Sequence, residues 1–120
     1  MPRSMEREPV RETPLRVLLA NEPRSYRESI AAVFRHLRPG LQVEVVEPEA
    51  LESSVVRSAP DVAICSRVTG VVRERVPVWI ELYPEHAAHS VASEKGRRTE
   101  FAEIQLLDLI SIIDRAAGPV

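Results

Sequence analysis

Asp61-Val62-Ala63-Ile64-Cys65 is a short stretch in the middle of the chain in which every residue after the aspartate is apolar. A run of this length that follows Pro60 favours a β-strand. Continuous apolar character is typical of a strand that is buried on both faces, as in a parallel sheet that helices cover from two sides. We therefore expect this segment to be a buried strand of an α/β sheet.

The segments on the amino-terminal side predict the first strand and the first helix. Leu15–Ala20 is an apolar run that ends at Asn21-Glu22-Pro23, where a proline in the first turn marks a helix start. Pro39-Gly40 ends that helix. Residues 41–46 are rich in valine and predict the second strand. Apolar residues recur within the helix at helical spacing, at Tyr26, Ile30, Val33 and Leu37.

Helices and strands continue to alternate after the second strand. Residues 48–59 predict a helix, with Glu49 and Glu52 near its start, where the helix dipole favours negative charge. A short helix is expected at residues 71–75, and residues 77–83 predict a fourth strand. Strands that alternate with helices imply right-handed crossovers and a parallel sheet covered on both sides.

The last third of the chain departs from this alternation. Residues 90–93 and 97–100 predict a hairpin, because Gly96 can supply the positive φ angle of a tight turn. A final helix is expected at residues 104–117, where Gly118-Pro119 ends it. The predicted fold class is therefore α/β, a mostly parallel sheet of about five strands with helices on both faces and a modified carboxyl-terminal part. We expect residues 1–13 to be a flexible tail and 14–120 to form one domain.

The composition is that of an ordinary globular protein. Of the 120 residues, 44% are hydrophobic and 28% are charged, which suits one domain with one core. The formal net charge of -2 gives no electrostatic reason to expect nucleic acid as a partner.

The sequence has no apolar stretch near the roughly 18 residues of a membrane span and no hydrophobic signal core. We therefore expect the protein to be located in the cytoplasm. The single cysteine, Cys65, excludes an internal disulfide and a cysteine-pair metal site.

Two of these segments resemble the receiver domains of bacterial response regulators. Val17-Leu18-Leu19-Ala20-Asn21-Glu22-Pro23, followed by Tyr26-Arg27-Glu28, is similar to the start of receivers fused to LuxR-type DNA-binding domains, where a strand ends in two acidic residues. Pro60-Asp61-Val62-Ala63-Ile64-Cys65-Ser66 is similar to the receiver segment Pro-Asp-x-x-x-x-Asp, whose last residue is phosphorylated. The resemblance covers residues 15–83 and implies a receiver-like, flavodoxin-like fold in which a β-hairpin replaces the family's fourth helix. An unrelated flavodoxin-like domain is the alternative.

The resemblance also implies a degenerate phosphorylation pocket. Ser66 stands in the slot of the phosphoacceptor, and its hydroxyl is a shorter and chemically different group from a carboxylate nucleophile. Asn21 and Glu22 correspond to the acidic pair that holds Mg²⁺, which leaves one carboxylate where a hard cation prefers several charged oxygens. The family's hydroxyl residue after the fourth strand falls on Leu82, or on Glu81 if the alignment slips by one residue.

These departures predict a pseudo-receiver, a non-catalytic signalling module that binds another protein or itself in the manner of a two-component regulator. We expect it to need no cofactor and no metal, and not to be an enzyme. The alternative function is binding of a small molecule in the crevice at the carboxyl ends of the strands, where open α/β sheets place their ligands. That crevice would be lined by Asn21, Glu22, Ser66, Arg67 and Glu81.

Some polar residues allow a second interpretation. A hydrolase could use Ser66, but its neighbours lack the glycines of a nucleophile elbow. The spacing of His86 and His89 suits two ligands of one metal, but no further histidine or cysteine cluster supports a closed site. Cys65 is expected to be a small core residue, since a reactive thiol needs exposure and a cationic neighbour such as Arg67. Glu81 would need an arginine partner if a helix covers it.

The final helix has a wider apolar surface than one sheet face requires. One stripe suits the core and contains Leu106, Leu109, Ile110 and Ile113. Three further apolar residues fall off that stripe, namely Ile104, Leu107 and Ile112. Such an excess marks either a helix wedged between neighbours or an interface with another chain, and we expect a homodimer through this helix if the second case holds.

Overall fold

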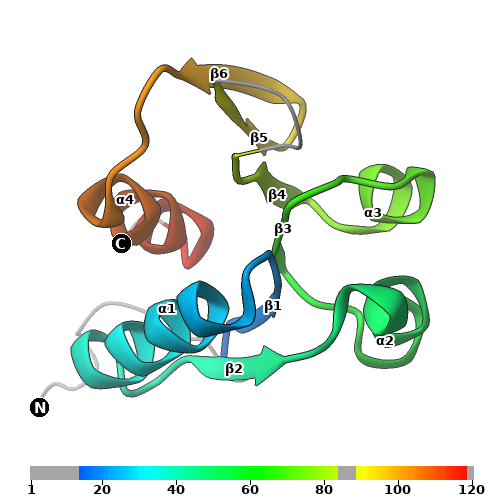
Figure 1. Cartoon of the computed structure of the whole chain (residues 1–120), viewed down its shortest axis with the longest axis horizontal. Helices are drawn as coiled ribbons and strands as arrows, with labels where there is room; N and C mark the ends of the chain where they lie inside the picture. The colour runs from blue at the N-terminus through cyan, green and yellow to red at the C-terminus, as the bar shows by residue number, and fades with distance from the viewer. Residues whose placement is uncertain (1–13, 84–88, 119–120) are drawn as a thin grey trace, which may run out of the picture.

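The computed structural model describes residues 14–83 and 89–118, and in these residues the chain forms a six-stranded sheet with helices on both faces (Figure 1). The strands are β1 (Arg16–Ala20), β2 (Gln42–Val45), β3 (Val62–Cys65), β4 (Val78–Glu81), β5 (Ser90–Glu94) and β6 (Arg97–Phe101). The helices are α1 (Arg24–Leu37), α2 (Leu51–Ser58), α3 (Gly70–Arg75) and α4 (Leu106–Ala116), with a 3₁₀ turn, η1 (Pro48–Ala50), before α2. The predicted α/β class and the mostly parallel sheet with helices on both faces are confirmed, and the sheet has six strands where about five were expected.

Strand β3 lies in the interior of the sheet, whose order is β2-β1-β3-β4-β5-β6. It pairs in parallel with β1 on one side and with β4 on the other. Val62, Ala63 and Ile64 have no exposed surface, and Cys65 is 1% exposed. The prediction from the continuous apolar run is confirmed, because both faces of this strand are buried.

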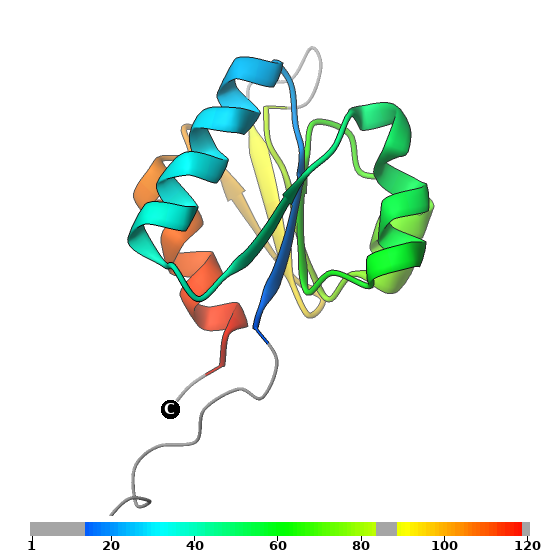
Figure 2. The same ribbon diagram turned by 90° about the horizontal axis from the view of Figure 1, so that it is seen from below.

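Two helices cover each face of the sheet. Figure 2 shows α1 and α4 on one side of the strands and α2 and α3 on the other. Along β1, Val17 and Leu19 belong to the core beneath α1 and α4, whereas Leu18 and Ala20 belong to the core beneath α2 and α3. This alternation follows from the two-residue period of a strand and produces two separate hydrophobic layers.

The inward face of α1 differs from the predicted one. The buried residues are Arg27, Ile30, Ala31 and Phe34. Val33 is only partly buried, and Leu37 is 42% exposed. The apolar pattern allowed two inward faces one residue apart, which differ by about 100° around the helix. The structure selects the face that contains Phe34, which is fully buried, and this choice also buries an arginine.

The predicted hairpin is present at the end of the sheet beyond β4. Strand β5 runs antiparallel to β4, and β6 runs antiparallel to β5. Lys95 and Gly96 form the two-residue turn with φ angles of 54° and 89°, the positive values that a type I′ turn requires. Among the described residues, no helix lies between β4 and β5. The sheet is therefore parallel from β2 to β4 and antiparallel beyond it.

Helix α4 is wedged into the protein's own core, which corrects part of the expected interface. Ile104 is 3% exposed and Ile112 is fully buried, so neither side chain is available on the surface for a second chain. Leu107 is 74% exposed, and Leu106, which was expected in the core stripe, is 39% exposed. The wide apolar arc arises because the helix packs beside α1 and against the sheet at once.

Two ion pairs hold α4 to its neighbours. Arg38, at the end of α1, donates from Nε and Nη2 to the carboxylate of Asp114 at 2.8 and 2.9 Å. Arg115 donates in the same manner to Glu94 of β5 at 2.8 and 3.0 Å. The side chains are partly exposed, so solvent screens each pair and its contribution to stability is small. Their bidentate geometry nevertheless orients the helix.

Some sequence predictions fall on residues that the structure does not describe. The expected tail, residues 1–13, lies outside the described residues, as does His86. Across the described ranges, no helix is long and apolar enough to cross a membrane.

Replacing Gly96 by alanine should destabilise the protein by about 1 to 2 kcal/mol, because an L-residue is strained at positive φ. No atom lies within 4 Å of the added Cβ, so the backbone conformation is the sole cost. Gly70→Ala is the matched control, since that Cβ also meets open space and no positive φ is required. In urea denaturation, the urea concentration at the unfolding midpoint should therefore be lower for Gly96→Ala than for the native protein and nearly unchanged for Gly70→Ala. Equal midpoints would contradict the turn geometry.

Candidate functional site

A crevice of about 650 Å³ lies at the carboxyl ends of β1 and β3. Parallel strands end at the same edge of a sheet, and the chain leaves β1 and β3 for helices on opposite faces, which opens a space between the loops. The crevice is lined by Ala20, Glu22, Pro23, Pro48, Glu49, Leu51, Cys65, Ser66, Arg67, Thr69 and Tyr83. The predicted residues Glu22, Ser66 and Arg67 are therefore brought together at one edge of the sheet.

Ser66 joins the end of β3 to the end of β1. The backbone N–H of Glu22 donates a hydrogen bond to Oγ of Ser66 at 2.8 Å. Each residue directly follows its strand or lies one residue beyond it, so the sequence correctly predicts that they are close. The hydroxyl thus acts as an acceptor within the protein and stabilises the two loops against each other.

Asn21 is the most constrained polar residue at this edge. Its side chain is fully buried, and within the described residues neither its amide nitrogen nor its amide oxygen has a hydrogen-bond partner. Leaving a buried polar atom unpaired costs about 1 to 3 kcal/mol. Its chain neighbours Ala20 and Glu22 both line the crevice, but Asn21 itself does not, so the prediction that Asn21 lines the crevice is wrong.

Arg27 is a site residue that the sequence analysis missed. Its side chain is 1% exposed, and Nη1 donates to the backbone oxygen of Asn21 at 3.2 Å. The same nitrogen lies 3.4 Å from Oε2 of Glu22, and Nη2 lies 3.2 Å from Oε2 of Glu47. A buried guanidinium needs such partners, because its charge is costly to remove from water. The sequence feature that could have identified Arg27 is its position three residues before Ile30, which places both side chains on the inward face of α1.

Glu81 and Leu82 have different roles from those expected. Oε2 of Glu81 accepts a hydrogen bond from the backbone N–H of Val68 at 2.9 Å, so a backbone donor serves where an arginine was predicted. Leu82 is 1% exposed and packs in the core beneath α1 and α4, so its placement in the pocket is wrong. Side chains alternate along a strand, and the next residue, Tyr83, lines the crevice instead.

The described residues give little support for nucleophilic or metal chemistry. Cys65 is buried, and burial together with the nearby Glu81 carboxylate raises the pKa of its thiol to about 12. His89 is exposed, and no histidine is among the described residues that line the crevice. No group of three or more histidine, cysteine, aspartate or glutamate side chains within 14–83 and 89–118 is arranged to hold a metal ion.

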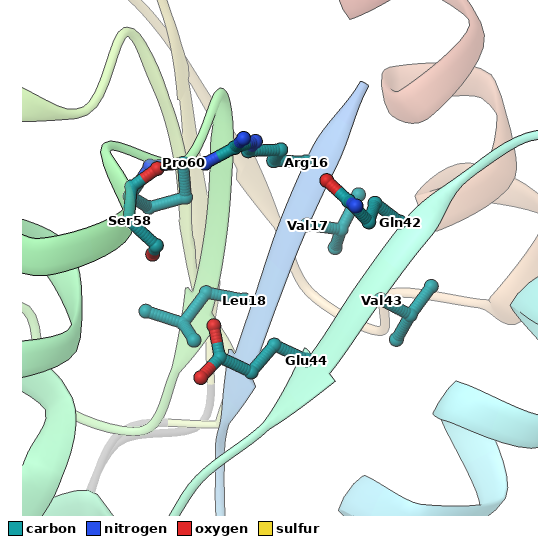
Figure 3. Close-up of a pocket in the computed structure, with 8 residues that line it drawn as sticks. All are labelled: Arg16, Val17, Leu18, Gln42, Val43, Glu44, Ser58 and Pro60. Carbon is teal, nitrogen blue, oxygen red and sulfur yellow. Dashed lines mark hydrogen bonds between the residues drawn. The ribbon is translucent and has the colours of Figure 1, made fainter. Parts of the chain in front are cut away.

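A smaller hollow of about 300 Å³ lies near the amino ends of β1 and β2 (Figure 3). Arg16 crosses it and donates from Nη1 to the backbone oxygen of Ser58 at 2.7 Å. Glu44 accepts from Nη2 of Arg57 at 2.8 Å. Because these charged side chains are satisfied within the protein, we place the candidate site at the crevice.

Comparisons of the chain with protein-family models, curated proteins and solved structures find no match. The functional argument therefore depends on the geometry of the residues described above.

The Cys65 thiol should resist alkylation in the native protein, because a pKa of about 12 leaves almost no thiolate at pH 8. Folding raises this pKa, so the contribution to stability is complete at neutral pH and is lost as the pH rises from about 9 to about 12. Iodoacetamide at pH 8 should modify the native protein at least about 100-fold more slowly than the urea-unfolded chain. Similar rates in the two states would show that the thiol is accessible.

Proposed function

We propose that the protein is a receiver-like regulatory module that is not phosphorylated on aspartate and acts by binding a protein chain. One observation carries this proposal: Ser66 follows the central strand β3, and its hydroxyl is occupied by the N–H of Glu22. A receiver needs a free carboxylate nucleophile at that position. Here Ser66 takes that position, and its hydroxyl stabilises the contact between the ends of β3 and β1.

The strand order supports the receiver-like part of the proposal. Flavodoxin-like sheets have the order 2-1-3-4-5, with the functional site at the point between strands 1 and 3 where the order reverses. The order β2-β1-β3-β4 and the parallel pairing agree with this arrangement as far as β4. The antiparallel β5 departs from it, in the part of the chain where the resemblance ends.

The charges at the crevice also favour a role without metal-assisted phosphorylation. Glu22 is the acidic residue that remains of the expected pair, and its Oε2 lies 3.4 Å from the guanidinium of Arg27. A cation that approached this carboxylate would compete with the positive charge already beside it. Hard cations such as Mg²⁺ prefer several charged oxygens, so the arrangement disfavours Mg²⁺.

The start of α4 is the surface that we propose for self-association. Leu107 is 74% exposed, Leu106 is 39% exposed and Tyr83 is 40% exposed. The Tyr83 hydroxyl donates to the backbone oxygen of Ile104 at 3.0 Å, which holds the ring near the start of the helix. We assign the occupant as a second copy of the chain, because a two-fold axis would bring the same leucines together from both copies.

Light scattering over a concentration series should show reversible association that Leu107→Glu weakens at least about tenfold, because a carboxylate would be buried in the interface. Val56→Glu is the matched control, since Val56 is 55% exposed on a different helix and the charge change is the same. Acetyl phosphate with Mg²⁺ should leave the association unchanged. A particle that stays monomeric at the highest concentration, or association that depends on acetyl phosphate, would contradict the proposal.

A second candidate function is binding of a small molecule in the crevice. One observation favours it: the volume of the crevice, about 650 Å³, falls within the range of ligand sites. Nothing in this candidate requires catalysis.

A thermal-shift measurement with flavin mononucleotide tests the crevice. Bound ligand at about 100 times its Kd should stabilise the protein by about 2.7 kcal/mol. Glu49→Trp, which places a bulky ring in the crevice lining without altering the core, should abolish that shift. A shift that survives in Glu49→Trp, or the absence of a shift in the native protein, would remove this candidate.

A further inference from the structure

A basic groove lies at the opposite edge of the sheet from the crevice. It has a volume of about 460 Å³ and lies between the end of α3 and the β5–β6 turn. The backbone N–H of Lys95 donates to the oxygen of Pro77 at 2.8 Å, which holds the turn beside the start of β4. The groove is lined by Arg73, Glu74, Arg75, Val76, Pro77, Trp79, Ser93, Lys95, Gly96 and Arg98.

The floor of the groove is a row of three residues that strand register brings together. Trp79 of β4 lies opposite Ser93 of β5, and Ser93 lies opposite Arg98 of β6. Because the serine between them is small, the guanidinium of Arg98 reaches over the Trp79 ring, 5.4 Å from its centroid. This cation–π contact positions Arg98 but does not use its N–H groups as hydrogen-bond donors, so these groups can bind a ligand in the groove.

The positive charge of the groove is unbalanced. Four of its lining residues are cationic, namely Arg73, Arg75, Lys95 and Arg98, and one, Glu74, is acidic. Within the described part of the chain, none of these four cations forms an ion pair or a hydrogen bond through its side chain. Arginines elsewhere do form pairs: Arg24 with Glu28, Arg38 with Asp114, Arg57 with Glu44 and Arg115 with Glu94. Four cations without a carboxylate partner therefore line one hollow of a protein whose net charge is -2.

We infer that this groove binds a small ligand that carries a diphosphate group. Guanidinium groups bind phosphate oxygens in a bidentate manner, and the groove is lined by two arginines of α3, the lysine of the β5–β6 turn and an arginine of β6. The volume suits a small phosphorylated molecule, and the apolar lining residues Val76, Pro77 and Trp79 lower the local dielectric and strengthen the attraction. No residue of the crevice takes part, so the site is independent of the proposed function.

Trp79 gives the test a direct signal, because it is the single tryptophan of the chain and forms the groove floor. Its fluorescence should change saturably when pyrophosphate or ADP is added at constant ionic strength, as the ligand draws Arg98 away from the ring. The double variant Arg73→Gln/Arg75→Gln should weaken both affinities at least about tenfold. Both arginines are exposed, so the variant should fold normally, which circular dichroism checks.

The matched control is Arg24→Gln/Arg57→Gln, which removes the same two charges from α1 and α2 and should change the affinities less than about twofold. The absence of a saturable signal, or equal weakening by the two double variants, would overturn the inference. A short single-stranded oligonucleotide that bound at least about tenfold more tightly than ADP would also overturn it, since the groove would then be a nucleic-acid site.

Discussion

The parallel pairing of β1 and β3, with the Ser66 hydroxyl between their carboxyl ends, is the constraint on which the rest of the structure depends. Both strands are buried on two faces, so their register and direction cannot change without exposing core residues. From their ends the chain enters α1 on one face and α3 on the other. The crevice is the space that this divergence leaves, and Glu22 and Ser66 meet there for the same reason.

The second half of the sheet explains why the protein has a separate basic groove. The layer of α2 and α3 packs on β1, β3 and β4, and in the described residues no helix covers the hairpin on that face. On this face the row that runs from Trp79 through Ser93 to Arg98 has its first two side chains buried, and Arg98 is exposed at its end. The crevice is lined by the acidic Glu22 and Glu49 together with the basic Arg67, whereas four of the residues that line the groove are cationic, so the two hollows differ in charge.

Much of the fold could be predicted from local patterns, because each depends on few neighbours. The apolar run before Ser66 identified the central strand, and Gly96 identified the hairpin turn. Patterns that depend on which of two faces packs inward were less informative. The inward face of α1 was rotated from the predicted one, and Ile112 of α4 filled the core although it lay off the main stripe.

The candidate site was predicted in part for the same physical reason. Residues that directly follow parallel strands must meet at one edge, which placed Glu22 and Ser66 correctly. Leu82 was misplaced because one residue of shift along a strand moves a side chain to the other face. The spacing of Arg27 from Ile30 placed it on the inward face of α1, but its burial also depends on Glu47, 20 residues away, and the local pattern does not reveal that partner.

Amide hydrogen exchange at Glu22, followed by NMR, tests most directly whether Ser66 joins β3 to β1. The account predicts that this amide exchanges at least about tenfold faster in Ser66→Ala than in the native protein, and that Ser66→Thr, which keeps a hydroxyl, restores protection. The Gln42 amide, which donates to Leu15 at the other end of β1, should be unaffected in all three proteins. Equal exchange at Glu22 in the native protein and Ser66→Ala would contradict the account.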